Sequence, residues 1–128
     1  MILDTTFVID ILKGRPEAIE KLRQMERARH PILLTTVSIF ELWQGIEVKD
    51  KEKEEKIKET LENFPLVTLD LRGAELAGNI HGGLERKGMV IDPEDSMISG
   101  IALSRNEAVL TRNERHFKRV NGLRIELY

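Results

Sequence analysis

The sequence of 128 residues contains no cysteine, which excludes disulfide bonds, zinc–thiolate sites and a catalytic thiol. It has no basic excess either: the formal net charge is -2 at pH 7, so any binding of nucleic acid must depend on a local patch. No apolar run approaches the roughly 18 residues that span a bilayer, and the first residues, MILDTT, lack the pattern of a signal peptide. We therefore expect a cytoplasmic protein with no membrane partner.

The residues that are present fit a globular protein, with 41% hydrophobic and 33% charged residues. The length fits a single domain spanning residues 1–128. Short apolar runs alternate with amphipathic stretches, which favours an α/β fold with a mainly parallel sheet. Strands are predicted at residues 1–3, 31–35, 66–69, 108–111 and 123–127, and GMVI (88–91) is a less clear candidate.

Helices are predicted between these runs. Residues 16–28 and 70–87 carry apolar side chains at helical spacing, and Gly88 ends the second stretch. The charge run DKEKEEKIKE (50–59) predicts a solvated helix with Glu–Lys pairs at i,i+4 and with Ile57 facing inward.

Polar residues stand at the ends of several apolar runs. Asp4 follows the first run, Glu41 lies near the start of the helix after the second, and Asp92 and Asp95 follow GMVI. The polar residues after AVL are Thr111, Arg112 and Asn113. In open parallel sheets, ligands bind at the carboxyl ends of the strands. If these ends converge, three or four carboxylates share one pocket.

Such a pocket needs a cation, because neighbouring carboxylates raise one another's pKa or recruit a metal. Oxygen ligands without histidine or cysteine suit Mg²⁺ or Mn²⁺ better than zinc. A cation of this kind can orient a water and offset the charge that develops in an in-line displacement. The chemistry that fits best is hydrolysis of a phosphodiester.

Each acid also has a structural interpretation. The segment from Ser38 to Glu41 fits a capping box, in which the glutamate reaches back to the first amide of its helix. Asp92 and Asp95 fit a second capping box, with Pro93 at the first helical position. Asp4 lies in an apolar stretch and is either functional or an N-cap, since an unpaired buried carboxylate is costly. Asp10, which follows on the next helix, is expected to be solvated or to act as a cap.

Four segments, in order, resemble the motifs of PIN domains. They are MILDTTFVIDIL at the start, TTVSIFELWQG around Glu41, IDPEDSMISGIAL around Asp95, and AVLTRNERHF near the end. Together they extend from Met1 to Phe117, nearly the whole chain. The size of the chain is most similar to that of the VapC toxins of toxin–antitoxin pairs.

The resemblance implies a three-layer α/β/α fold with a central, mainly parallel sheet of about five strands. It implies an Mg²⁺- or Mn²⁺-dependent endoribonuclease, an RNA substrate, a cognate antitoxin and a homodimer. By motif, Asp4, Glu41 and Asp95 are the metal-binding acidic triad, and Asn113 completes the catalytic set in place of the frequent aspartate. Asp95 is the match because it directly precedes the Ser-Met-Ile helix face, whereas Asp92 is expected to cap the helix.

Other residues near the motifs have supporting roles in this interpretation. Thr6, Thr111 and Asp92 are candidates for the outer shell of the site. Arg112 and Arg115 are candidates for contacts to RNA phosphates. His116 is expected to be a surface or packing residue rather than a general base. Ser99-Gly100 replaces the usual pair of alanines and still allows close helix packing.

Two other functions remain open from the sequence. The same site would serve a housekeeping nuclease for RNA maturation or decay, and a PIN-like module without activity would bind RNA or a partner protein. A receiver-type phosphoacceptor is disfavoured, because Arg112 follows the late run AVLT where such a protein needs a lysine.

Overall fold

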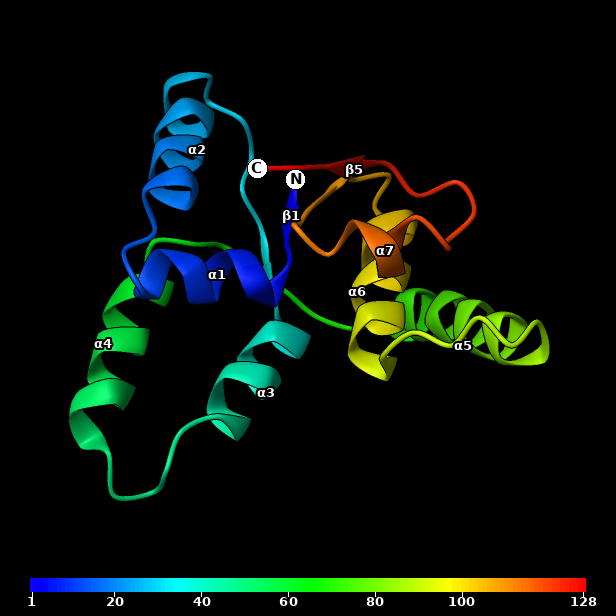
Figure 1. Ribbon diagram of the computed structural model, residues 1–128, viewed down its shortest axis with the longest axis horizontal. Helices are drawn as coiled ribbons and strands as arrows, with labels where there is room; N and C mark the ends of the chain where they lie inside the picture. Colours follow the sequence, from blue (N-terminus) through cyan, green and yellow to red (C-terminus); the bar gives the residue numbers. More distant parts are fainter.

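The computed structural model describes every residue from 1 to 128. Figure 1 shows α1 to α4 on one side of the strands and α5 to α7 on the other. The helices are α1 (Thr5–Leu12), α2 (Pro16–Arg27), α3 (Thr36–Gln44), α4 (Lys51–Leu61), α5 (Leu71–Arg86), α6 (Pro93–Ser104) and α7 (Glu114–Phe117). The strands are β1 (Ile2–Leu3), β2 (Leu34–Thr35), β3 (Leu66–Val67), β4 (Val109–Leu110) and β5 (Ile125–Glu126).

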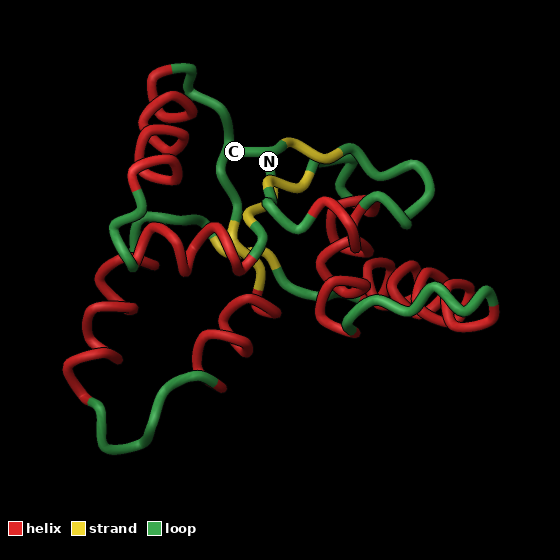
Figure 2. The backbone as a smooth tube through the Cα atoms, in the orientation of Figure 1, coloured by secondary structure: helices red, strands yellow, loops and turns green.

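The strands are parallel throughout and meet at the centre of the molecule (Figure 2). β4 lies between β1 and β5, and β2 pairs with β3. A bridge between Ile2 and Leu33 joins the two groups, so that β1 lies next to the β2 side of the fold. The predicted parallel α/β arrangement is confirmed, although each predicted strand position holds a shorter paired segment. Residues 88–91 form no strand.

The two faces of the strands enclose different cores, because successive side chains of a strand point to opposite faces. Leu3 and Leu110 belong to the core beneath α1 to α4, which also contains Phe7. Their neighbours Ile2 and Val109 belong to the core beneath α6 and α7. The sheet is therefore covered on both sides, as a parallel sheet requires.

Helices α5 and α6 pack unusually closely at Gly100. A Cβ atom at this position would lie 2.3 Å from the carbonyl oxygen of Gly73 and 2.8 Å from Cβ of Ala77. The expected close packing at Ser99-Gly100 is confirmed. This contact holds the long α5 against α6, the helix that carries Asp92 and Asp95.

The helix starts differ in part from the capping patterns of the sequence. Asp92 is the N-cap of α6 and is followed by a proline, as predicted, but its side chain makes no capping hydrogen bond. The prediction of a capping box from Ser38 to Glu41 is wrong, because α3 begins three residues earlier than that pattern requires and Thr35 is its N-cap. The hydroxyl of Thr35 accepts the hydrogen bond from the Ser38 amide at 3.1 Å, which leaves Glu41 free for other contacts.

The charge run forms α4, as predicted. Ile57 is buried, and Lys58 pairs with Glu54 at 2.9 Å across one turn. Of the Glu–Lys pairs expected at i,i+4 spacing, Glu52 with Lys56 is not formed, and Glu54 also contacts Lys51 at 3.6 Å. None of the helices is both long enough and apolar enough to cross a membrane.

Candidate active site

Asp4 lies at the carboxyl end of β1, beside the end of the neighbouring strand β4. Since β1 and β4 run parallel in register, Thr111 at the end of β4 reaches Asp4 directly. Oγ1 of Thr111 donates a hydrogen bond of 2.6 Å to Oδ2 of Asp4, and Oγ1 of Thr6 donates a second of 2.7 Å. Asp4 occupies the N-cap position of α1 but makes no side-chain capping bond. Its carboxylate is buried and faces the site instead.

Glu41 is held next to Asp4 by the first residue of α1. Oγ1 of Thr5 lies 2.7 Å from Oε1 of Glu41 and 2.9 Å from Oγ of Ser38. Thr5 and Ser38 are both buried, so this contact fixes the side of α3 that faces the start of α1. Nothing in the sequence marks Thr5 except its place beside Asp4.

Asp95 lies in the first turn of α6 and is tied to the segment after β4. Its Oδ2 accepts hydrogen bonds from Nδ2 of Asn113 at 3.2 Å and contacts Nδ1 of His116 at 2.6 Å. The amide of Asn113 in turn donates to Oγ1 of Thr111 at 2.8 Å. A chain of hydrogen bonds therefore connects Asp4, through Thr111 and Asn113, to Asp95.

The three acids share one electrostatic environment. Burial raises the pKa of Asp4 above its ordinary value, although the hydroxyls of Thr111 and Thr6 oppose the shift. Burial raises the pKa of Glu41 to about 7, and the negative charges of Asp4 and Asp95 add to this effect. Burial also raises the pKa of Asp95 to about 6; its contact with His116 opposes the shift and the charge of Asp4 favours it. Burial thus destabilises the charged form of each carboxylate, and neighbouring negative charges add to this effect at Glu41 and Asp95.

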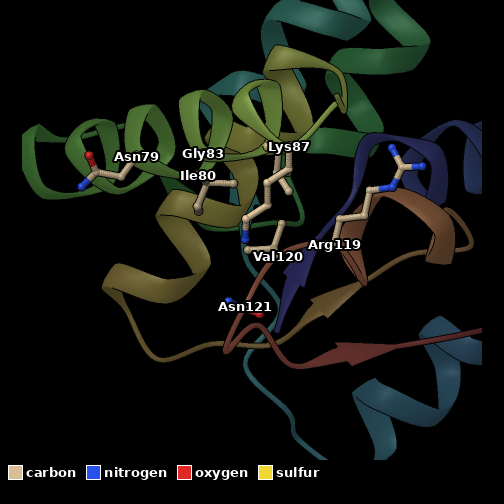
Figure 3. A pocket seen from close by; sticks show the side chains of 8 residues that line it. Asn79, Ile80, Gly83, Lys87, Arg119, Val120 and Asn121 are labelled. Atoms are coloured by element: carbon tan, nitrogen blue, oxygen red, sulfur yellow. The ribbon is translucent and has the colours of Figure 1, made fainter. Parts of the chain in front are cut away.

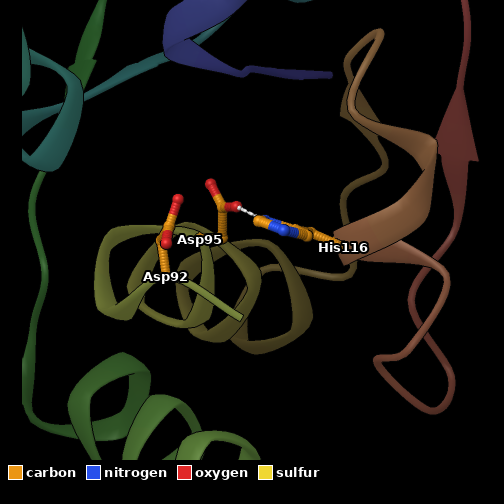
Figure 4. Close-up of side chains that lie close together, drawn as sticks. All are labelled: Asp92, Asp95 and His116. Carbon is orange, nitrogen blue, oxygen red and sulfur yellow. Dashed lines mark hydrogen bonds and ion pairs between the residues drawn. The ribbon is translucent and has the colours of Figure 1, made fainter. Parts of the chain in front are cut away.

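Asp92 lies beside Asp95, on the solvent-exposed side of the acidic group. One ligand atom each of Asp92, Asp95 and His116 lies within 4.8 Å of the other two. Figure 4 shows both carboxylates pointing to the same side of α6 while His116 approaches from α7. An acidic cluster able to hold a metal is therefore present where α6 begins.

The sequence missed two further contributors. His116, expected to be a surface or packing residue, contacts Asp95; it stands three residues after Asn113, a helical spacing that places both on one face. Glu94 lies near enough to raise the pKa of Glu41 by its charge.

The expectation for Asp10 is wrong. This carboxylate is buried rather than solvated, with 1% of its surface exposed. Arg15 lies 2.9 Å from its Oδ1, and Oδ2 meets Arg112 at 3.0 Å and the hydroxyl of Tyr128 at 2.9 Å. The two arginine charges and the hydrogen bond from Tyr128 compensate the charge that burial would otherwise penalise, although Oδ1 itself accepts no hydrogen bond. Burial raises the pKa of Tyr128, and its hydrogen bond to Asp10 raises it further.

Arg112 and Arg115, the two candidates for contacts to RNA, differ in their surroundings. The guanidinium of Arg112 turns to Asp10, although about half of this side chain remains exposed. Arg115 is exposed and forms no ion pair. Contact of either with RNA stays a prediction.

A separate cavity of 240 Å³ lies between α5 and the segment after α7 (Figure 3). Lys87 and Arg119 line it together with Asn79 and Asn121, but no carboxylate does. Arg119 also donates to the carbonyl oxygen of Val90 at 2.9 Å. This cavity is therefore distinct from the acidic site.

Comparison with known proteins finds relatives along nearly the whole chain. The tRNA(fMet)-specific endonuclease VapC of Salmonella typhimurium is 31% identical over 126 residues, covering 97% of this chain and 94% of that protein. Ribonuclease VapC2 of Haemophilus influenzae is 32% identical over 128 residues, with the same coverage of both chains. 

Solved structures of known proteins share the fold of this chain. A chain of the DNA-bound VapBC structure from Salmonella typhimurium superposes with a TM-score of 0.87 at 29% identity, covering 98% of this chain and 96% of that one. A chain of VapBC2 from Rickettsia felis, bound to a promoter DNA fragment, has a TM-score of 0.88 at 22% identity and covers 99% and 97%. The model of the PIN domain family matches residues 1–123. The chain therefore belongs to the PIN domain family.

Proposed function

We propose that this protein is a metal-dependent endoribonuclease and the toxin of a toxin–antitoxin pair. The observation that carries the proposal is that Asp4, Glu41 and Asp95 lie close together in one site. The pKa values of Glu41 and Asp95 are raised in part by the charges of their neighbours. Perturbed carboxylates that gather at the ends of parallel strands mark a functional site. The names of the relatives, VapC endonuclease and ribonuclease, support the same activity.

The donor set fits Mg²⁺ or Mn²⁺. The hydrogen bonds from side chains reach only Oδ2 of Asp4 and of Asp95, so Oδ1 of each is left for a cation. Asp4, Asp95 and Glu41 would hold the ion, with Asp92 in an outer position. Bound there, the ion would polarise the scissile phosphate and lower the pKa of a coordinated water.

The residues around the acids keep them in place. Thr6 and Thr111 fix the Asp4 carboxylate, and Asn113 and His116 fix that of Asp95. Such supporting hydrogen bonds orient metal ligands and tune their basicity.

Cleavage of RNA in the presence and absence of metal tests the proposal. The name of the Salmonella relative specifies tRNA(fMet), so a transcript of this tRNA is the first substrate to assay. We expect cleavage with Mg²⁺ or Mn²⁺, products with a 5′-phosphate, no cleavage in excess chelator, and a loss of at least about a hundredfold in the Asp4→Asn variant. Cleavage that persists in chelator, or full activity of Asp4→Asn, would exclude this mechanism.

We also propose an antitoxin partner, a homodimer and a cytoplasmic location. The similar Salmonella chain comes from a VapBC complex, which supports a partner of that kind. Phe40 and Leu71 are 57% and 78% exposed and leave apolar surface for such contacts. Co-expression with the product of a neighbouring short reading frame should yield a complex. Light scattering of the isolated protein should give twice the mass of one chain.

A further inference from the structure

The cavity between α5 and the segment after α7 is lined by cations from two separate elements. Lys87 follows the last residue of α5, and Arg119 lies two residues beyond the end of α7. Figure 3 shows Lys87 reaching from α5 toward Val120. Asn79 and Asn121 add polar side chains, whereas none of the lining residues is acidic. The cavity therefore offers positive charge and hydrogen-bond donors to an anion.

The charges of Lys87 and Arg119 are not neutralised within the protein. Neither side chain takes part in an ion pair. The guanidinium of Arg119 donates to the uncharged carbonyl oxygen of Val90 at 2.9 Å. The acids of the same two elements, Glu85 and Glu114, contact other side chains. Two unpaired positive charges thus face one cavity of a protein whose net charge is -2.

Stabilisation of the helix end accounts for only part of this arrangement. A cation at the end of a helix interacts favourably with the helix dipole, which suits Lys87 at the end of α5. The carbonyl oxygens of Leu84 and Glu85, however, already accept hydrogen bonds from the amides of residues 87–89. Helix capping also gives no reason for Arg119 to line the same cavity from another element. An anionic ligand explains both cations together.

The surface around the cavity is locally basic. Residues 111–124 contain five arginines and lysines but a single acid, Glu114. Arg86 of α5 and Arg115 of α7 are exposed and form no ion pair. A chain without an overall basic excess needs a local patch of this kind to bind nucleic acid.

The cavity is also attached to the elements that carry the acidic site. The amide of Arg119 donates to the carbonyl oxygen of His116 at 3.1 Å, and the imidazole of His116 contacts Asp95. The guanidinium of Arg119 holds the carbonyl oxygen of Val90, two residues before Asp92. The cavity therefore lies beside the acidic site, within reach of a polymer bound there.

We propose that this cavity binds a backbone phosphate of the RNA substrate, separate from the phosphate that is cleaved. This inference rests on the proposed ribonuclease function and adds a second point of attachment for its substrate. The volume of 240 Å³ is smaller than the roughly 300–1,000 Å³ of pockets that enclose a whole small-molecule ligand, so the cavity suits one charged group of a larger molecule. Phosphate contacts position a nucleic acid without reading its sequence. Lys87 and Arg119 would thus orient a folded RNA on the acids.

Paired substitutions on two distant helices test the assignment. The cavity variant is Lys87→Gln with Arg119→Gln. The matched control is Arg23→Gln with Arg27→Gln, which removes the same charge from exposed positions of α2, on the other side of the molecule from α5 (Figure 1). Binding of the tRNA(fMet) transcript is measured by filter retention in excess chelator, so that the RNA stays intact. Thermal unfolding checks that both variants fold.

We expect the cavity variant to bind the transcript about tenfold more weakly. The slope of log affinity against log salt should fall by about 0.7 to 0.9, the value for one phosphate contact. In cleavage with Mg²⁺, KM should rise by a similar factor. The control should keep both the affinity and the slope, and Lys87→Arg with Arg119→Lys should restore them. Equal affinities of the cavity variant and the control would overturn the proposal.

A second pair of variants leaves both cations and their contacts in place. Gly83 lines the cavity, and a Cβ atom added there would meet no atom within 4 Å. Gly83→Glu brings a negative charge to the cavity, and Gly83→Gln is a neutral control of the same size. Both residues favour a helix more than glycine does, so α5 should stay folded. We expect Gly83→Glu to bind the transcript about fivefold more weakly than Gly83→Gln, and equal affinities would contradict the proposal.

Other outcomes separate this inference from the proposed function and from a site for free phosphate. If the unaltered protein cleaves RNA and the cavity variants bind RNA as it does, the cavity assignment is overturned and the nuclease function stands. If inorganic phosphate raises the Tm of the unaltered protein but not that of the cavity variant, while both bind RNA equally, the cavity holds a free anion and the assignment is again overturned. RNA binding that depends on Lys87 and Arg119, without any metal-dependent cleavage, would support the cavity and exclude the proposed nuclease activity.

Discussion

Nη1 of Arg112 lies 3.0 Å from Oδ2 of the buried Asp10, and this ion pair anchors the segment that carries two site residues. Arg112 stands between Thr111, which donates to Asp4, and Asn113, which donates to Asp95. Asp10 lies near the end of α1, the helix that begins directly after Asp4. The pair therefore fixes the segment after β4 relative to α1, and with it the distance between Asp4 and Asp95.

Replacing either member of this pair should destabilise the protein. We expect Asp10→Ala to destabilise the protein by about 3 kcal/mol or more, since it leaves arginines and a tyrosine without their partner. Arg112→Ala should cost less, about 2 kcal/mol, because Arg15 and Tyr128 still contact Asp10. Chemical denaturation of the two single variants and the double variant gives the coupling energy. A value near zero would show that the pair does not act as an anchor.

Protonation of the site should stabilise the metal-free protein. The pKa values of Glu41 and Asp95 are raised to about 7 and about 6 in the folded chain, from 4.5 and 3.8. A raised pKa gives stability that is fully present below the unfolded value and is lost as the pH rises through the folded value. Between about pH 4 and pH 7 the metal-free protein should therefore lose stability from this site.

Mg²⁺ should reverse this loss, because it binds the deprotonated carboxylates of the folded state. Calorimetry should give a larger increase in Tm with Mg²⁺ at about pH 8 than at about pH 5.5. The Asp4→Asn variant should show little response at either pH. An equal response of the unaltered protein at both pH values would contradict carboxylate binding of the metal.

The sequence predicted the parts of the site that depend on strand order. Asp4 and Thr111 follow apolar runs, and parallel neighbouring strands necessarily bring such ends together. The burial of Asp10 could not be read in the same way, because it depends on Tyr128, which is 118 residues away along the chain. One signal was nevertheless present: Asp10 interrupts the run FVIDIL, and a helix that is apolar all around is a buried helix.

The contacts of Glu41 were missed for a different reason. The pattern from Ser38 to Glu41 satisfies the rule for a capping box, but Thr35 also satisfies the rule for an N-cap. The strand β2 decides between them, because it ends at Thr35 and the helix follows at once. Local rules allowed both starts, and tertiary structure selected one.

The close packing of α5 and α6 predicts opposite effects for two glycines. Gly100→Ala would place Cβ 2.3 Å from the carbonyl oxygen of Gly73, so the helices must move apart. We expect a loss of about 2 kcal/mol or more in the free energy of unfolding. Gly78→Ala on α5 has no atom within 4 Å of the added Cβ and should stabilise the protein by up to about 1 kcal/mol. Urea denaturation of both variants measures the difference, and a neutral Gly100→Ala would refute the packing argument.

His116 should contribute to activity by holding Asp95. Its Nδ1 lies 2.6 Å from Oδ2 of Asp95, the same oxygen that Asn113 contacts, so His116→Ala frees one side of the carboxylate. Loss of such a supporting contact typically lowers metal affinity or activity by about 10- to 100-fold. We expect a loss of this size in cleavage rate and in Mn²⁺ affinity measured by calorimetric titration, with little change in Tm.

His81 provides the control for His116. Its side chain contacts Ser96 at 2.9 Å, and it forms no hydrogen bond with any of the site acids named above. His81→Ala should keep full Mn²⁺ affinity, and an equal loss in both variants would show that His116 has no specific role at Asp95.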